Sequence, residues 1–219
     1  MNITMDDAPD AVNGRRPYDA TGRRQQARRN REAIITVAVR RFLGDGYAAT
    51  TVASIAAEAG VSTHTIYKSF GGKPGLIRAI RARALEGEGP VPAEERSDQL
   101  HTADATAEAI LDGWGALTAE IAPLVAPILL LVRDAAAADP EVRALQEELD
   151  EDRLRRMTDN ARRLLETGQV RPSISLERVA DLLWTYSAPE LYELLVARRH
   201  WSTESYARFV SESLTSALL

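Results

Sequence analysis

The chain has 219 residues, of which 45% are hydrophobic and 27% are charged, a composition typical of a globular protein with a core of its own. It contains no cysteine, which excludes disulfides and thiolate chemistry. Its longest apolar run, residues 121–132, has 12 residues, fewer than the roughly 20 that a membrane-spanning helix needs. Because residues 1–22 also lack the apolar segment of a signal peptide, we expect a cytoplasmic protein with no membrane partner.

The formal net charge of −5 is unevenly distributed along the chain. Residues 1–80 contain 12 Lys and Arg against 7 Asp and Glu, whereas residues 81–219 contain 15 against 25. A basic N-terminal part on an acidic body is typical of a protein that meets a polyanion with one end. On charge alone, a solvated tail that only keeps the protein soluble explains the pattern equally well.

The N-terminal residues predict an arm followed by a long helix. Residues 1–22 are polar and contain two prolines and two glycines, so we expect a disordered basic arm. From Arg24 onward, apolar residues recur with a helical period. The expected apolar stripe consists of Ile35, Ala38, Val39, Phe42 and Leu43. The glycines that follow this stripe should end the helix.

Two short helices are expected next. Thr51 and Ser62 each carry a hydroxyl that can accept a backbone N–H at a helix start, and Gly60 separates the two helices. Pro74 suits the first turn of a fourth helix, which we expect to end near residue 86. Two short helices joined by a glycine-containing turn are typical of a helix-turn-helix motif. We therefore assign residues 23–86 to a helix-turn-helix DNA-binding domain.

The remaining residues predict a second helical domain. Residues 86–98 are rich in Gly, Pro and acids and read as a connector. Beyond it, at residues 99–219, we expect a ligand-binding and dimerisation domain with helices at 102–120, 121–138, 141–167, 176–199 and 203–218. No sustained apolar–polar alternation predicts a strand. The sequence thus predicts an all-α fold, with an N-terminal three-helix helix-turn-helix domain and a larger C-terminal helical domain.

The second short helix carries an unusual set of side chains. At about 100° per residue, Thr63, His64, Tyr67 and Lys68 fall on one continuous arc, opposite two apolar residues. No Asp or Glu occurs in residues 62–74. Because DNA phosphates repel carboxylates, an acid-free arc suits a surface that contacts DNA. A polar face that is merely solvated is the common alternative.

Position along the helices suggests which residues meet phosphates and which meet bases. Helix N-termini favour anions, so Thr51, Ser62 and Lys73 are candidate phosphate contacts. The residues that can reach base edges in the major groove are Thr63, His64 and Lys68. For Lys68, a phosphate contact is nearly as plausible as a base contact.

Residues 38–47 and 49–79 together resemble the DNA-binding domain of the TetR family of bacterial repressors. The matching positions are Phe42, Gly46, Tyr47, Thr50, Thr51, Val52, Ile55, Ala56, Ala59, Gly60, Val61, Ser62, Thr65, Ile66, Tyr67, Phe70, Lys73 and Leu76. The resemblance implies phosphate contacts by Thr51, Thr65, Tyr67 and Lys73. It places Thr63, His64 and Lys68 toward the bases.

Two features depart from the family pattern. Gly75 stands where a helix-forming, often acidic residue is common, and we expect it to loosen the first turn of the fourth helix. The arm is longer and richer in arginine than is usual. We hypothesise that Arg23, Arg24 and Arg28 reach an adjacent minor groove or flanking phosphates.

The C-terminal part contains a strongly apolar segment interrupted by Pro123 and Pro127. Prolines bend helices, and a bent apolar helix pair can leave a cavity. The candidate lining residues are Trp114, Leu117, Leu124, Ile128, Leu131 and Trp184. Filling of an ordinary core is the simpler explanation at any one of these positions. A ligand of such a cavity should be largely apolar.

The last two predicted helices have wide apolar faces. Pro189 interrupts the first of them, and Ser187 with Glu190 predicts a capping box at which the helix restarts or kinks. This segment also resembles the C-terminal part of many TetR-type regulators, in which the last two helices form a four-helix dimer interface. The candidate interface residues are Leu191, Leu194, Tyr206, Phe209, Val210 and Leu214.

The sequence gives little support to an enzyme. Its three histidines are scattered, and no triad, metal-ligand spacing or cofactor motif occurs. We expect a ligand-responsive regulator, most simply a nucleoid-associated repressor that binds a palindromic operator as a homodimer and is released by a small effector. The alternative is a dimeric DNA-binding or interaction protein without an effector.

Overall fold

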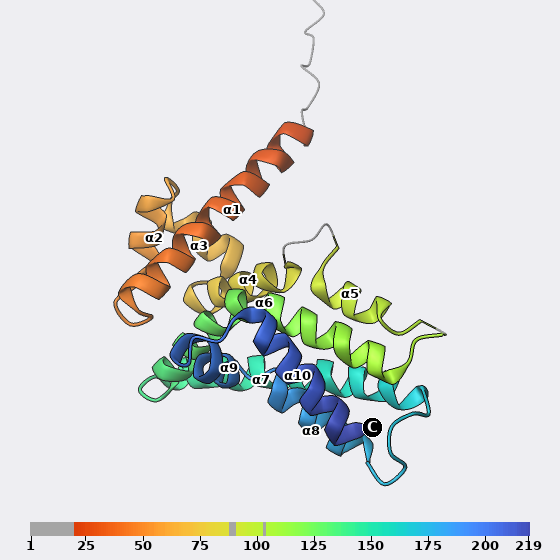
Figure 1. The fold of residues 1–219 in the computed structure, drawn as a ribbon. Coiled ribbons are helices and arrows are strands. Elements are labelled where there is room, and N and C mark those ends of the chain that lie inside the picture. The colour runs from red at the N-terminus through yellow and green to blue at the C-terminus, as the bar shows by residue number, and fades with distance from the viewer. Residues whose placement is uncertain (1–19, 88–90, 103) are drawn as a thin grey trace, which may run out of the picture.

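The computed structural model describes residues 20–87, 91–102 and 104–219, with side chains from residue 24 onward. Within these ranges the chain forms helices joined by turns and loops, and no strand. Figure 1 shows α1, α2 and α3 as one lobe and the helices from α5 onward as a larger body, with α4 between them. The predicted all-α fold is confirmed.

The N-terminal lobe has the predicted order of helices. They are α1 (Ala20–Asp45), α2 (Val52–Glu58), α3 (Thr63–Phe70) and α4 (Lys73–Glu86). Because α1 begins at Ala20, three residues assigned to the arm are helical; the rest of the predicted arm, residues 1–19, lies outside the described residues. The buried side of α1 is formed by Ile34, Ile35, Ala38 and Phe42. Leu43, expected on that side, is 47% exposed, since one step past Phe42 turns it by about 100°.

The larger domain contains one helix that was not predicted and one that is longer than predicted. Its elements are α5 (Ala93–Gln99), α6 (Ala107–Ala136), α7 (Pro140–Glu166), α8 (Leu176–Tyr186), α9 (Pro189–Tyr192), the π-helical turn η1 (Glu193–Arg198) and α10 (Thr203–Leu218). Helix α5 lies within the expected connector. It is held to α6 by Arg96, whose guanidinium donates to both carboxylate oxygens of Glu120 at 2.8 and 2.6 Å.

Helix α6 is continuous through Pro123 and Pro127, where two helices were expected. Among the described residues it is the one helix whose length and composition would suit a membrane span. In this fold it is instead the central helix of the larger domain, in contact with α4, α5, α7, α9 and α10. Burial of its apolar side chains by these neighbours stabilises the helix despite the two missing backbone donors.

The chain breaks between α8 and α9, as predicted, but not by the predicted capping box. The N-cap of α9 is Ala188, without a side-chain hydrogen bond. The Ser187 hydroxyl instead donates to the carbonyl oxygen of Trp184 at 3.0 Å and accepts from Arg153 at 3.1 Å. The side chain is therefore engaged in tertiary contacts and not in capping.

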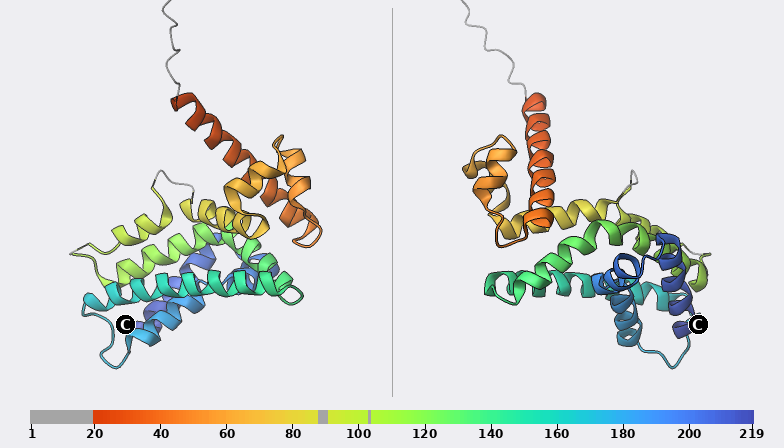
Figure 2. Two further views of the ribbon diagram at one scale, coloured as in Figure 1. Left: turned by 180° about the vertical axis from the view of Figure 1, so that it is seen from behind. Right: turned by 60° about the vertical axis from the view of Figure 1, so that its left-hand side comes forward.

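A single hydrophobic cluster joins the two lobes. It contains Phe42 and Ile66 of the N-terminal lobe together with Ile128 of α6 and Leu145 of α7. Figure 2 shows the crossing of α4, α6 and α7 at which this contact is made. The core of the N-terminal lobe is therefore continuous with the residues of α6 and α7 that pack against it.

Candidate nucleic-acid interface and ligand cavity

The outer face of α3 is oriented by a single buried residue. Ile66 is 0% exposed where α3 packs on α2 and α4. On the opposite side Thr63, His64, Tyr67 and Lys68 are all exposed, and the Tyr67 ring is 56% exposed. The residues predicted to form an acid-free arc thus lie together on one solvent-accessible surface, which we call the reading face.

Hydroxyl groups cap both short helices, as predicted. Thr51 Oγ1 accepts a hydrogen bond from the Ser54 backbone N–H at 3.0 Å, and Ser54 Oγ accepts one from Thr51 N–H at 3.3 Å. Ser62 Oγ accepts from Thr65 N–H at 3.1 Å and lies 2.9 Å from Thr65 Oγ1. A serine therefore completes a capping box that more often uses Glu or Gln. The positive ends of both helices stay free of carboxylates.

Lys73 connects the start of α4 to the turn before α2. Its ammonium donates to the carbonyl oxygen of Tyr47 at 2.7 Å and lies 4.1 Å from the centre of the Tyr47 ring. Burial lowers the pKa of Lys73, against the opposing effect of Asp139 and Glu141. Burial also raises the pKa of Tyr47 to about 12. Since an ammonium carries three donors, this structural bond leaves donors for the predicted phosphate contact.

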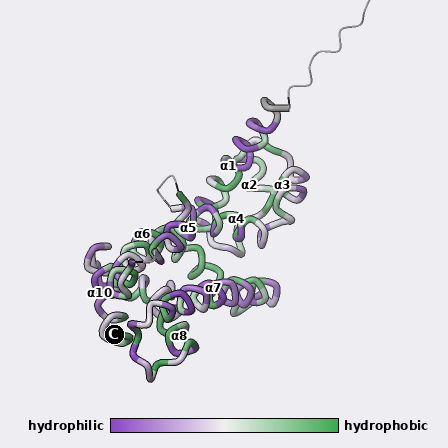
Figure 3. The backbone as a smooth tube through the Cα atoms, turned by 90° about the vertical axis from the view of Figure 1, so that its right-hand side faces the viewer, coloured by the Kyte–Doolittle hydropathy of each residue, from purple (hydrophilic) through white to green (hydrophobic). Residues whose placement is uncertain are grey.

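The basic residues of α1 lie on a helix that extends past α2 and α3 (Figure 1). Arg24 and Arg28 are exposed, whereas the side chain of Arg23 lies outside the described residues. Figure 3 shows that this end of α1 is predominantly hydrophilic. Further along, the Arg31 guanidinium carbon lies 4.7 Å from the centre of the Phe70 ring, a contact between α1 and α3 that sequence analysis missed.

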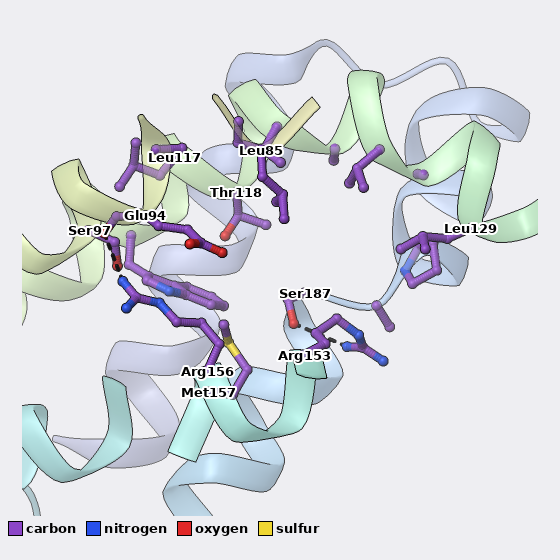
Figure 4. Close-up of a pocket in the computed structure, with 18 of the residues that line it drawn as sticks. Leu85, Glu94, Ser97, Leu117, Thr118, Leu129, Arg153, Arg156, Met157 and Ser187 are labelled. Atoms are coloured by element: carbon purple, nitrogen blue, oxygen red, sulfur yellow. Dashed lines mark hydrogen bonds between the residues drawn. The ribbon is translucent and has the colours of Figure 1, made fainter. Parts of the chain in front are cut away.

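The second candidate site is a cavity of about 140 Å³ in the larger domain (Figure 4). One stripe of α6 forms its mostly apolar wall. The residues of this stripe are Trp114, Leu117, Thr118, Ile121, Ala122, Val125, Ala126 and Leu129. Helix α4 contributes Arg81 and Leu85, and α5 contributes Ser97. The cavity therefore lies where the helix that leaves the DNA-binding domain meets the larger domain.

The wall opposite α6 is polar. Helix α7 contributes Arg153, Arg156, Met157 and Asn160, whose spacing of i, i+3, i+4 and i+7 places them on one face. Two buried residues of the lining, Asn160 and Ser97, are only 3% and 7% exposed. The cavity surface is thus mostly apolar, as a largely apolar ligand would need, and α7 adds polar groups to it. An Asn and two Arg residues at helical spacing, at positions 153, 156 and 160, are the sequence signal that could have identified this wall.

Three polar atoms of the lining are buried without a hydrogen-bond partner among the described residues. They are Ser97 Oγ, Asn160 Oδ1 and Arg153 Nε. Buried polar groups are almost always paired in folded proteins, because an unpaired one costs about 1–3 kcal/mol. Three such atoms thus belong to residues that line one cavity.

Two of the six predicted lining residues, Trp114 and Leu117, line the cavity. The other four, which lie outside it, are Leu124, Ile128, Leu131 and Trp184. Because α6 is one continuous helix, only one of its faces can border the cavity. Leu124 faces solvent at 39% exposure, and Ile128 is buried in the cluster shared with the N-terminal lobe.

The predicted dimer residues divide into two groups. Tyr206, Val210 and Leu214 are at most 1% exposed within the protomer, because this side of α10 packs on α6. They are core residues and have no surface to offer a partner, which corrects the prediction for these three. Leu194 is 53% exposed, and Leu191 and Phe209 are partly buried.

The fold and the two sites define a class: an all-helical protein with an N-terminal helix-turn-helix and a cavity in a separate helical domain. Residues 34–80 match the family described as bacterial regulatory proteins, tetR family. The helix-turn-helix domain of this chain therefore belongs to this family. Comparison with curated proteins found no match.

Solved structures share this fold across nearly their whole length. FadR from Bacillus subtilis, crystallised in complex with stearoyl-CoA, is 20% identical with a TM-score of 0.65, over 84% of this chain and 96% of that one. SmeT in complex with triclosan is 19% identical with a TM-score of 0.68, over 87% and 92%. NalD, the secondary repressor of the MexAB-OprM multidrug efflux pump in Pseudomonas aeruginosa, is 18% identical with a TM-score of 0.68, over 88% and 98%.

Proposed function

We propose that this protein is a ligand-responsive, cytoplasmic repressor that binds a palindromic operator as a homodimer and is released by a small effector. The observation that carries the proposal is the exposed, acid-free reading face of α3, on a helix-turn-helix whose N-caps are neutral hydroxyls. The residues assigned to DNA contact are Thr51, Ser62, Thr63, His64, Thr65, Tyr67, Lys68, Lys73, Arg23, Arg24 and Arg28.

Dimerisation follows from the geometry of DNA. Two reading helices must lie about 34 Å apart to enter successive major grooves, and a two-fold axis supplies this spacing and the palindrome. The outer side of η1 and α10 supports an interface, because Leu194 is 53% exposed there and the Phe209 ring is partly exposed. Leu191 and Phe209 would surround Leu194 in this contact.

Helix α4 supports a coupling between cavity and DNA. Leu76 and Ile77 pack in the core of the helix-turn-helix, while Arg81 and Leu85 of the same helix line the cavity. A ligand that binds more tightly to one position of α4 shifts the two reading helices away from the operator spacing. The cavity and its unpaired polar atoms favour this function over a DNA-binding protein without an effector. FadR with stearoyl-CoA and SmeT with triclosan are relatives in fold that bind small molecules.

The decisive experiment starts with selection of bound DNA from a random pool by the purified protein. A palindrome should emerge. Lys68→Glu should then weaken its binding by about a hundredfold or more, since a charge on the reading face is reversed. Arg162→Glu on α7, where the side chain is 55% exposed, is the matched control. Retention of full affinity by Lys68→Glu would contradict the proposal.

A further inference from the structure

The unpaired polar atoms of the cavity lie at two places along α7. At one end, Ser97 and Asn160 face the same region. Asp98, the neighbour of Ser97, accepts hydrogen bonds from Arg156 at 2.8 Å and from Arg163, which lie about one turn to either side of Asn160. Neither Ser97 Oγ nor Asn160 Oδ1 has a partner among the described residues. Ser97 and Asn160 are themselves uncharged and can donate and accept hydrogen bonds.

The second place is Arg153, seven residues or about 10 Å along α7 from Asn160. Its side chain is only 12% exposed. One terminal nitrogen donates to the Trp184 carbonyl oxygen and to Ser187 Oγ, the other lies 3.4 Å from Asp150, and the Trp184 ring covers the guanidinium at 4.3 Å. Figure 4 shows Arg153 and Ser187 together at the edge of the cavity. The group is fixed in place, yet its Nε–H has no acceptor among the described residues.

The charge around Arg153 is poorly balanced. Its ion-pair partner, Asp150, is 45% exposed and at the long end of ion-pair distances, and Glu190 is a further carboxylate in its surroundings. Burial lowers the pKa of Arg153, the opposite of what a well-paired arginine shows. The other two arginines of the lining are paired, Arg81 with Asp152 and Arg156 with Asp98. A buried guanidinium whose charge is weakly paired is stabilised by an added anion.

The size of the cavity limits what such an anion can be. Its volume of about 140 Å³ is close to that of an engineered cavity of about 150 Å³ in another protein that admits benzene. A single ring fits this space. The α6 wall, with Trp114, Leu117 and Ile121, provides the apolar surface on which a ring packs.

We propose that the cavity binds a single-ring carboxylate. The ring lies against α6, the carboxylate pairs with the Arg153 guanidinium, and a hydroxyl or carbonyl at the other end of the ring meets Ser97 and Asn160. This inference rests on the proposed function, because it specifies the ligand class of the same cavity.

Three probes of equal size and different charge test the inference: 4-hydroxyphenylacetate, 4-hydroxyphenylacetamide and tyramine. Their affinities are measured by isothermal titration calorimetry at neutral pH with the full chain and no DNA. The carboxylate should bind at least about tenfold more tightly than the amide, since a charge-assisted bond replaces a neutral one. Tyramine should bind more weakly than the amide. The ranking of these three affinities in the wild-type protein tests the inference without any variant.

Arg153→Met keeps the apolar stem and should remove the preference for the carboxylate, whereas Arg162→Met, on the same helix with an exposed side chain, should keep it. Equal affinities for the three probes, binding of none of them, or an unchanged preference in folded Arg153→Met would overturn the proposal. Operator release is measured separately. Release by an uncharged apolar compound without anion preference would overturn the inference alone, and anion binding without release would overturn the proposed function alone.

Discussion

Arg78 on α4 and Glu148 on α7 form a two-point ion pair between the two lobes. Arg78 Nε lies 2.7 Å from Glu148 Oε1, and Arg78 Nη2 lies 2.5 Å from Oε2. One turn further along α4, Arg81 lies 3.3 Å from Asp152. These two pairs fix the helix that runs from the DNA-binding domain to the cavity against the wall that carries Arg153.

The Arg78–Glu148 pair should stabilise the protein only above acidic pH. The hydrogen bond from Arg78 lowers the pKa of Glu148 in the folded protein. Its contribution is therefore present above the unfolded pKa of about 4.3 and is lost as the pH falls through the lower folded value. Both side chains are nearly half exposed, so a double-mutant cycle with Arg78→Met and Glu148→Gln should give less than about 1 kcal/mol at neutral pH. Measured by urea unfolding, the coupling energy should decrease as the pH is lowered below about 4. An equal coupling energy at neutral and at acidic pH would contradict this assignment.

Lys73 should contribute to stability as well as to DNA binding. Lys73→Met removes the hydrogen bond to the Tyr47 carbonyl oxygen and the contact with its ring, and should lower the free energy of unfolding by about 1–2 kcal/mol. Lys68→Met changes an exposed side chain and should lie within about 0.5 kcal/mol of the wild type. Chemical denaturation measures both. Equal stability of the two variants would show that the Tyr47 contact has no structural role.

The arginines at the free end of α1 should contact phosphates. Replacing Arg24 and Arg28 by Ala should make the slope of log operator affinity against log salt concentration less negative by about two. Each phosphate contact contributes about 0.9 to that slope. Arg155→Ala with Arg162→Ala removes two exposed charges from α7 and serves as the control. Fluorescence anisotropy at several salt concentrations gives the slopes. An unchanged slope in the α1 variant would rule out the contact.

Gly75 should be required by the junction of α3 and α4. A Cβ at this position would collide with the carbonyl oxygen of Phe70, whereas a Cβ at Gly44 in α1 meets nothing within 4 Å. Gly75→Ala should therefore destabilise the protein by about 1–3 kcal/mol. Gly44→Ala should be neutral or stabilising by up to about 1 kcal/mol, as expected for a helix. Thermal unfolding distinguishes the two, and a stable Gly75→Ala variant would contradict the close approach.

Leu194 should lie in the dimer interface. Leu194→Asp places a charge in an apolar contact and should give a monomer at concentrations at which the wild type is dimeric. Leu43→Asp is the control, since Leu43 is a similarly exposed leucine, at 47% against 53%, in the DNA-binding domain. Sedimentation equilibrium measures the association. A Leu194→Asp dimer as tight as the wild type would place the interface elsewhere.

Much of the DNA-binding domain was predictable because its determinants are local. Thr51 and Ser62 cap helices through groups three residues away, and the periodicity around Ile66 alone places Lys68 on the outer face. The structure of the connector, residues 86–98, was harder to predict. Gly and Pro at its start predicted a loop. Helix α5 is instead stabilised by the ion pair between Arg96 and Glu120, which lies 24 residues later on α6.

The sequence by itself determined the fold class, the family of the helix-turn-helix domain and the reading face. Helix capping, periodicity and the absence of carboxylates are properties of neighbouring residues. Only the tertiary structure decided that Tyr206 is a core residue, that Lys73 binds the Tyr47 carbonyl oxygen 26 residues away, and that Ser97 faces the same cavity as Asn160. An amphipathic helix has one apolar stripe that suits a partner subunit, its own core or a cavity equally well. Which of these it meets depends on the packing of helices that are distant in the chain.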